Sequence, residues 1–156
     1  MIAASLLAEL RRRGETVAVA ESITGGAIAS AFTEIPGASE IFLGGVVAYG
    51  NDAKVNLLGI APELIESEGV VSREVASAMA IGARQRFQAT WGIATTGVAG
   101  PGPHDGIAAG EVWIAISGPK EEAQHLSLGE LGRLEVRGGA VTGALALLSR
   151  ILRQDS

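Results

Sequence analysis

The chain has 156 residues, of which 47 % are apolar but only 4 % aromatic, so it can form one domain with a core of Ala, Val, Leu and Ile, whose small side chains suit helices lying closely on a sheet. Its net charge of −5 argues against nucleic acid as the main partner. The absence of cysteine excludes disulfides, thiolate metal sites and a cysteine nucleophile. No stretch is typical of a signal peptide or a membrane span, so we expect a soluble cytoplasmic protein without membrane contact.

The first half of the chain alternates helical periodicity with short apolar runs. Gly44-Gly45 within one of these runs indicates a bulge or a close approach of another backbone. In chain order the pattern predicts a helix over 2–13 ended by Gly14, a strand over 16–20, a helix over 24–32, a strand over 41–49, a helix capped by Asn51 and a short helix from Pro62.

The second half continues the alternation and adds a hairpin. The predicted elements are a helix capped by Ser72 whose buried stripe reaches Phe87, strands over 91–95, 112–117 and 123–128, and a terminal helix with an apolar face from Val141 to Leu152. The turn-like residues 118–120 make the last two strands an antiparallel pair. This order predicts a single domain over 1–156: a three-layer α/β/α sandwich with a mixed, mostly parallel sheet of about five strands.

Ser22 occupies the first segment that is able to carry chemistry, Ala20-Glu21-Ser22-Ile23-Thr24-Gly25-Gly26. A turn from strand to helix exposes a side chain at the carboxyl edge of the sheet and aims free helix amides in front of it. A serine there can act as a nucleophile, with donors for the oxyanion. Alternatively, Ser22 is the N-cap of the helix. Glu21 either faces the site or pairs with a nearby amide.

Two further segments also follow predicted strands. Tyr49 and Lys54 flank the junction of a strand and a helix, where both side chains can face one cleft, although an exposed phenol and a surface lysine are the alternative. Residues 95–103 are too rich in Gly and Pro for regular structure and either line a ligand site or form a stiff connector. They match neither the phosphate-loop nor the dinucleotide pattern. The following His104 either acts together with Asp105 as a catalytic base or is an exposed loop residue.

Together these segments resemble the C-terminal domain family of the competence/damage-inducible protein CinA, whose stand-alone form is a nicotinamide-nucleotide amidase. The similarity covers essentially the whole chain. The matching strings are Ala20-Glu21-Ser22-x-Thr24-Gly25-Gly26, Pro36-Gly37-Ala38-Ser39, Phe42-Leu43-Gly44-Gly45-Val46-Val47-x-Tyr49, Asn51-x-x-Lys54, Val71-Ser72 and Thr96-Gly97-Val98-Ala99-Gly100-Pro101-Gly102.

The resemblance implies hydrolysis of the carboxamide of nicotinamide mononucleotide to nicotinate mononucleotide and ammonia. It implies Ser22 as nucleophile with Lys54 and Tyr49, no metal or cofactor, and a homodimer. Because no histidine accompanies the matched strings, Lys54 must act as the base and needs a pKa lowered by desolvation or a nearby positive charge. The substrate-binding residues expected from the resemblance and the amide positions are Glu21, Thr24, Gly25, Gly26, Thr96, Gly97, Gly100, Arg133 and Arg137, with the two arginines as phosphate partners.

The chain departs from the family pattern in the segments expected to bind substrate. Residues 103–110 lack the Lys of the usual Lys-Pro-Val-Gly, and Leu131-Gly132-Arg133 stands where Gly-Asp-Arg is usual. These differences concern affinity and specificity more than chemistry. Two other functions therefore stay open: a non-catalytic module that binds a nucleotide or a partner protein, and an amidase for another small carboxamide.

Overall fold

Five strands form a single sheet in the computed structural model, which describes residues 1–155. In spatial order they are β2 (Phe42–Val47), β1 (Val17–Glu21), β3 (Trp91–Gly97), β4 (Glu111–Ser117) and β5 (Glu122–Ser127). β1 pairs in parallel with β2 and β3, whereas β4 is antiparallel to both β3 and β5. Four strands therefore share one direction, and the predicted mixed, mostly parallel sheet with a terminal hairpin is confirmed.

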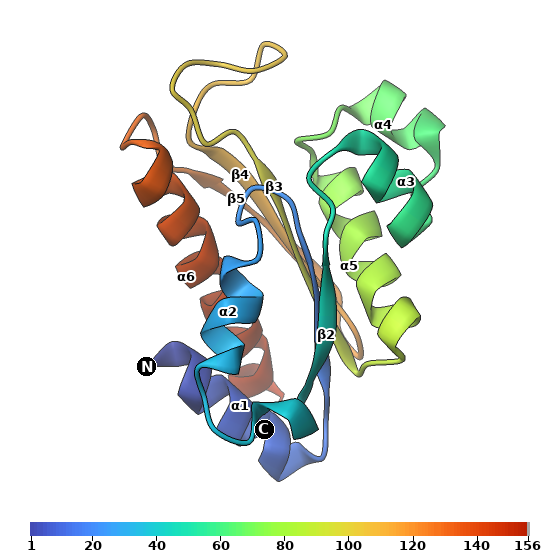
Figure 1. The fold of residues 1–156 in the computed structure, drawn as a ribbon, viewed down its shortest axis with the longest axis vertical. Helices are drawn as coiled ribbons and strands as arrows, with labels where there is room; N and C mark the ends of the chain where they lie inside the picture. Colours follow the sequence, from blue (N-terminus) through green and yellow to red (C-terminus); the bar gives the residue numbers. More distant parts are fainter. Residues whose placement is uncertain (156) are drawn as a thin grey trace.

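Helices cover both faces of this sheet (Figure 1). One face carries α1 (Ile2–Arg13), α2 (Ala27–Thr33) and the terminal α6 (Arg133–Gln154), and the other carries α3 (Asn51–Leu58), α4 (Pro62–Glu68) and α5 (Arg73–Phe87). A short 3-10 turn, Ala38–Glu40, precedes β2. The three-layer prediction is confirmed. None of the described helices, the long α6 included, combines the length and apolarity that crossing a membrane requires.

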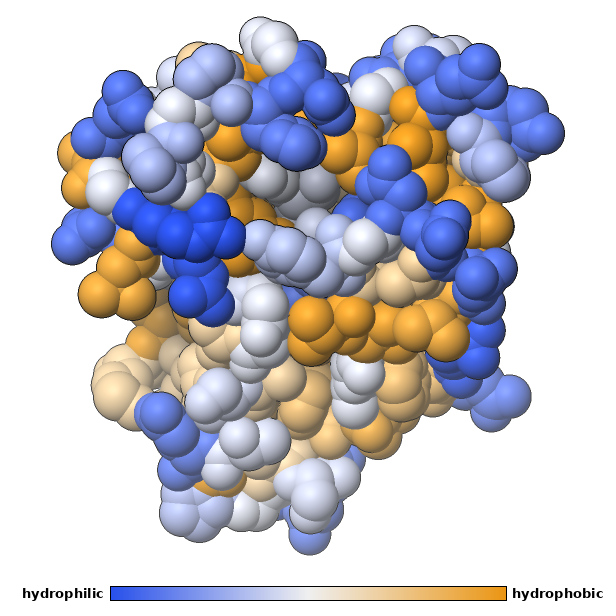
Figure 2. Space-filling view, turned by 45° about the horizontal axis from the view of Figure 1, so that its top comes forward, coloured by the Kyte–Doolittle hydropathy of each residue, from blue (hydrophilic) through white to orange (hydrophobic). Residues whose placement is uncertain are grey.

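The carboxyl ends of β1, β2 and β3 meet at one edge of the sheet because these strands run in parallel. The turn after β1, the segment after β2 and the long connection from β3 to β4 all lie at this edge, beside the start of α6 (Figure 1). Figure 2 turns this edge towards the viewer, and the surface there is hollowed between hydrophilic and hydrophobic side chains.

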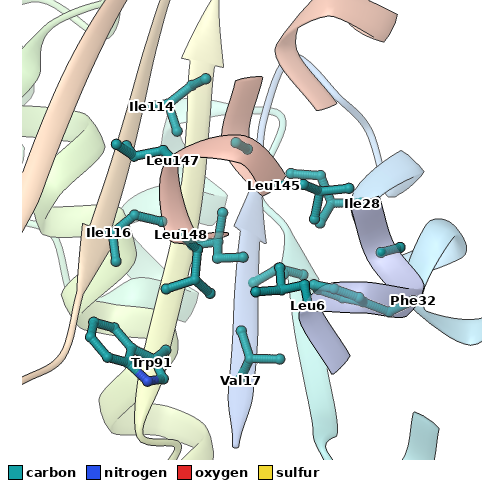
Figure 3. Packing of buried hydrophobic residues seen from close by; sticks show 14 of the residues in the cluster. Leu6, Val17, Ile28, Phe32, Trp91, Ile114, Ile116, Leu145, Leu147 and Leu148 are labelled. Carbon is teal, nitrogen blue, oxygen red and sulfur yellow. The ribbon is translucent and has the colours of Figure 1, made fainter. Parts of the chain in front are cut away.

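The sheet separates two apolar clusters of different character. Large side chains fill the face of α1, α2 and α6, where Val17, Ile114 and Leu148 belong to one continuous cluster (Figure 3). On the face of α5 the strands present alanines, and a Cβ added at Gly92 would overlap the carbonyl oxygen of Ala80. The expected packing of helices closely on the sheet through small residues is therefore found on the α5 face.

Most predicted element bounds agree with the structure to within two residues, and Ser72 caps α5 through a bond from the Val75 amide. The strand register shifts by one residue between Val17 and Ala18, where Leu43 has no partner, so the predicted bulge lies directly before Gly44. A Cβ at Gly45 would overlap the Val19 side chain, so a close approach occurs there as well. Asn51 is the first helical residue of α3 and Gly50 its N-cap, so the predicted Asn51 cap is wrong by one position.

The largest difference concerns the segment after β1. The predicted helix over 24–32 begins only at Ala27, because Gly25 and Gly26 adopt φ of 58° and 102° and form a turn. The N-cap of α2 is Gly26, so the interpretation of Ser22 as a helix cap is wrong. Ser22 instead begins a five-residue turn, Ser22 to Gly26, which we call the Ser22 turn.

Candidate active site

A cavity of about 310 Å³ opens at the carboxyl edge of the sheet. Its wall combines the Ser22 turn, the start of α3, the connection between α4 and α5, the Gly- and Pro-rich connection after β3, and the start of α6. The residues that line it are Ser22, Ile23, Tyr49, Asn51, Lys54, Val70, Val71, Thr96, Gly97, Val98, Ala99, Gly100, Pro101, Gly102, Pro103, His104 and Arg133.

Ser22 and Lys54 meet at the floor of this cavity. Lys54 Nζ donates to Ser22 Oγ at 3.0 Å, and the two side chains come from different layers, one after β1 and the other from α3. Lys54 is only 1 % exposed and Ser22 8 % exposed. The pair predicted from two separate segments therefore lies within hydrogen-bond distance in a desolvated position.

Two backbone carbonyls complete the surroundings of the Lys54 amine. Nζ donates to Ala48 O at 2.9 Å and to Tyr49 O at 3.2 Å. A neutral amine has two N–H donors and one lone pair, so it can satisfy both carbonyls and still accept the Ser22 hydroxyl proton. The arrangement thus fits the uncharged form of the lysine as well as the charged form.

Burial lowers the pKa of Lys54 from its ordinary value of 10.5 to about 8. Desolvation disfavours the ammonium form, and it is the only cause of this pKa change. Of the two causes considered from the sequence, desolvation therefore acts, and a neighbouring positive charge does not contribute. A lysine with this pKa has an appreciable neutral fraction near physiological pH.

Tyr49 contributes to the site in a different way from its expected one. Its phenol is directed to Arg133, whose Nη2 donates to Tyr49 Oη at 2.8 Å, and the residue is 60 % exposed. Its contact with Lys54 is made by the backbone carbonyl. Arg133 Nη1 also donates to Gly100 O at 2.7 Å, so this arginine links the segment after β2 to the connection after β3 across the cavity.

Five of the expected site residues do not line the cavity: Glu21, Thr24, Gly25, Gly26 and Arg137. Glu21 is fully buried, and its carboxylate accepts from the amides of Ile28 at 2.8 Å and Ala29 at 3.0 Å. Of the two roles left open for Glu21, pairing with a nearby amide is the correct one. The helix start that was expected to face a substrate is therefore occupied by this carboxylate.

Arg137 and Thr24 are likewise engaged inside the protein. Arg137 donates to the carbonyls of Ile23 and Thr24 at 3.1 and 3.0 Å, and the Thr24 hydroxyl is 2.8 Å from that of Thr95. Thr96, Gly97, Gly100 and Arg133 do line the cavity, as expected, and the Thr96 hydroxyl donates to Val70 O at 2.8 Å.

The cavity also contains residues that were not among the expected site residues, chiefly Asn51, Val70 and Val71, although Asn51 and Val71 belong to strings that carry the family resemblance. The two valines lie between α4 and α5 and follow no strand, so the rule about carboxyl ends of strands could not locate them. His104 is exposed, and its Nε2 lies 3.5 Å from Asp105 Oδ2, so it is an exposed loop residue that also contacts Asp105. Within residues 1–155 no group of three or more His, Cys, Asp or Glu side chains is placed to hold a metal ion.

Fold and site define a class of protein: a three-layer α/β/α domain with a ligand-sized cavity and a buried Ser-Lys pair at the carboxyl edge of its sheet. Comparison with protein families gives a match of residues 1–152 to the CinA C-terminal domain. The chain therefore belongs to the CinA C-terminal domain family, as the sequence resemblance predicted.

Curated relatives named CinA-like protein support this membership. The one from Synechococcus sp. RCC307 is 48 % identical over 151 residues, covering 94 % of this chain and 36 % of the relative. The one from Prochlorococcus marinus MIT 9313 is 48 % identical over 160 residues, covering 99 % of this chain and 37 % of the relative. The chain thus spans little more than a third of the length of the curated relatives it matches.

Solved structures of similar length share the fold. The competence/damage inducible protein CihA from Agrobacterium tumefaciens is 38 % identical with a TM-score of 0.90, covering 97 % of this chain and 93 % of that one. A CinA superfamily protein from Klebsiella pneumoniae 700603 is 30 % identical with a TM-score of 0.93, covering 98 % and 96 %.

Proposed function

We propose that this domain is a nicotinamide-nucleotide amidase, which hydrolyses the carboxamide of nicotinamide mononucleotide to nicotinate mononucleotide and ammonia. The observation that carries the proposal is the buried contact of 3.0 Å between Lys54 Nζ and Ser22 Oγ, together with the lowered pKa of Lys54. A serine hydroxyl needs a neighbouring base to attack an amide, and this lysine is placed and tuned to be one.

In the proposed reaction, neutral Lys54 takes the Ser22 proton while Oγ attacks the carboxamide carbon. Its two N–H groups keep their bonds to Ala48 O and Tyr49 O throughout the transfer. The protonated Lys54 then gives a proton to the departing nitrogen, so ammonia leaves and an ester to Ser22 remains. Water attacks that ester while Lys54 accepts its proton. Lys54 returns this proton to Ser22 Oγ as the ester bond breaks, and the acid product loses its own proton to solvent and leaves as the carboxylate.

The oxyanion requires hydrogen-bond donors that face the cavity. The amides of Gly25, Ala27, Ile28 and Ala29 all have partners inside the protein. In residues 96–103, which line the cavity, the amides of Val98 and Gly102 are likewise bonded to Glu111 O and the Glu130 carboxylate, and Pro101 and Pro103 have no amide hydrogen. We therefore assign oxyanion binding to the other amides of this segment rather than to the start of α2. One such donor typically lowers the barrier by roughly 3 kcal/mol.

Arg133 is the proposed phosphate ligand. It lines the cavity, and its present acceptors, the phenol oxygen of Tyr49 and the carbonyl of Gly100, are both uncharged. A phosphate dianion binds a guanidinium more strongly than uncharged oxygens do, so substrate is expected to displace at least one of these contacts. The phosphate would then anchor the nucleotide at the rim while the carboxamide reaches Ser22.

Ammonia release from nicotinamide mononucleotide by the purified domain tests the proposal. We expect Ser22→Ala and Lys54→Ala each to abolish release while circular dichroism stays that of the wild type. Lys120→Ala, which removes an exposed lysine bonded to Gln154, is the matched control and should be fully active. Near-normal turnover by the Lys54 variant would contradict the Ser-Lys scheme.

The other two functions give different results in the same assays. A non-catalytic module would bind the nucleotide in calorimetry without releasing ammonia. An amidase for another carboxamide would act equally well on amides with and without a phosphate. From the resemblance we also propose a homodimer. Size-exclusion chromatography with light scattering would detect it as a particle of twice the chain mass.

A further inference from the structure

Two buried or half-buried charged side chains contact the backbone around the Ser22 turn, and neither lines the cavity. Four other contacts hold the turn: the Ser22 amide donates to Thr95 O at 3.0 Å, the Gly25 amide to Ser22 O at 3.1 Å and the Ala27 amide to Thr24 O at 3.0 Å, and the Thr24 hydroxyl lies 2.8 Å from that of Thr95. Its two glycines in left-handed conformations give it little intrinsic stiffness. The position of Ser22 Oγ therefore also depends on the side chains that contact the turn from the interior of the protein.

Glu21 holds the downstream end of the turn. Strand alternation places its side chain on the α2 face, because Val17 and Val19 also point there while Ala18 and Ala20 face α5. Its two carboxylate oxygens accept from two successive amides at the start of α2. The residue before the nucleophile is thus bonded directly to the helix that follows the turn, and the turn closes into a loop.

Arg137 holds the middle of the turn. From the second turn of α6 it donates to the two successive carbonyls of Ile23 and Thr24. It also passes close under Gly25, where an added Cβ would lie 3.2 Å from Arg137 Nη2. Carbonyls of the turn accept hydrogen bonds from Arg137, and amides of α2, just after the turn, donate hydrogen bonds to Glu21. The two charged side chains therefore bind both backbone acceptors and backbone donors of this segment.

We infer that Glu21 and Arg137 are positioning residues that hold Ser22 Oγ against Lys54 Nζ by clamping the backbone of the Ser22 turn. The inference rests on the proposed role of Ser22 and deepens it, since it gives different tasks to Arg133 and Arg137, the two arginines near the start of α6. Arg133 faces the substrate, whereas Arg137 faces the turn. Lys54 comes from the opposite helical layer, so a displacement of the turn directly changes the distance between the two reacting atoms.

Kinetics on a pair of substrates separate positioning from phosphate binding. Nicotinamide mononucleotide and its phosphate-free counterpart, nicotinamide riboside, are compared for Arg137→Gln, Arg133→Gln and the control Arg150→Gln on the same helix, where the wild-type arginine pairs with Glu122 at the surface. We expect Arg137→Gln to lower kcat about 10- to 100-fold on both substrates with little change in KM, as a misplacement of about 1 Å does. Arg133→Gln should raise KM for the phosphorylated substrate alone, and Arg150→Gln should behave as wild type.

A substrate-independent readout keeps this test separate from the proposed function. The rate at which a fluorophosphonate probe labels Ser22, followed by mass spectrometry, should fall about 10-fold or more in Glu21→Gln and in Arg137→Gln but not in Arg150→Gln. Wild-type labelling rates in a folded Arg137→Gln, or a KM effect confined to the phosphorylated substrate, would overturn the inference. If the wild type releases no ammonia from either amide but labelling still slows in the variants, the proposed function fails and the positioning role stands. If Glu21→Gln does not fold, Arg137→Gln alone decides the outcome.

Discussion

The lowered pKa of Lys54 predicts a specific dependence of turnover on pH. A base with a pKa of about 8 is neutral in roughly a tenth of the molecules at pH 7, against roughly 0.03 % for a lysine with the ordinary pKa. The desolvation of this one side chain therefore increases the neutral fraction of Lys54, the form that can act as a base, about 300-fold at pH 7. We expect kcat/KM for ammonia release to rise tenfold per pH unit below pH 8 and to level off above it.

The same pKa has a consequence for stability, with a definite sign. Between pH 8 and 10.5 the unfolded chain binds the Lys54 proton and the folded chain does not, so the free energy of unfolding rises with pH across this window. Lowering the pKa from 10.5 to about 8 corresponds to about 3 kcal/mol of destabilisation at neutral pH that disappears as the amine deprotonates.

Urea unfolding of wild type and Lys54→Met at pH 7, 8, 9 and 10 measures this term, because all other titrations cancel in the difference. Methionine keeps a long apolar side chain without the charge. From pH 7 to pH 10 the wild type should gain about 2 to 3 kcal/mol relative to the variant. A constant difference across that range, together with a flat pH profile of turnover between pH 6 and 9, would refute the assignment of Lys54 as a desolvated base.

Tyr49→Phe should change kcat less than about threefold, because Lys54 is held by the Tyr49 carbonyl and the phenol contacts Arg133; a loss of 100-fold would instead make the phenol part of the proton transfer. Gly92→Ala should lower the free energy of unfolding in urea by about 1 to 3 kcal/mol, because the added Cβ overlaps the Ala80 carbonyl; an unchanged midpoint would show that α5 can shift at no cost. Treatment with EDTA should leave ammonia release unchanged, and a loss restored by added zinc would count against the metal-free scheme.

The fold was largely predictable because its signals are local. Apolar periodicity, the Ser72 cap and the turn-like residues 118–120 predicted every helix and strand, and the small-residue composition anticipated the close packing of α5. The prediction failed at Thr24 to Gly26, where helical spacing appeared to continue. Two consecutive glycines with positive φ break that helix, and sequence alone does not distinguish glycines that adopt such angles from glycines that stay helical.

From local pattern alone, the candidate site was predictable at the positions that follow strands, whereas Arg133 was expected from the family resemblance. Ser22 and Lys54 were found because the carboxyl ends of parallel strands share an edge, but the burial of Lys54 is a tertiary property. Arg133 and Arg137 carried equal weight in the sequence, since residues four apart share a helix face. They differ because Arg137 lies one turn further along α6, at the level of the Ser22 turn rather than of the cavity rim.

The location of the departures from the family pattern determines which step they are expected to affect. The groups assigned to chemistry, Ser22 and Lys54, are buried, whereas Tyr49 and residues 103–106 of the loop that lacks the usual lysine are exposed. A change at the rim alters which ligands are held without moving the reacting atoms, because the Ser22 turn is anchored from inside the protein. The altered loop is therefore expected to change KM and the choice of carboxamide. In contrast, kcat is expected to depend on the contacts of Glu21 and Arg137 with the Ser22 turn and on the desolvation of the Lys54 amine.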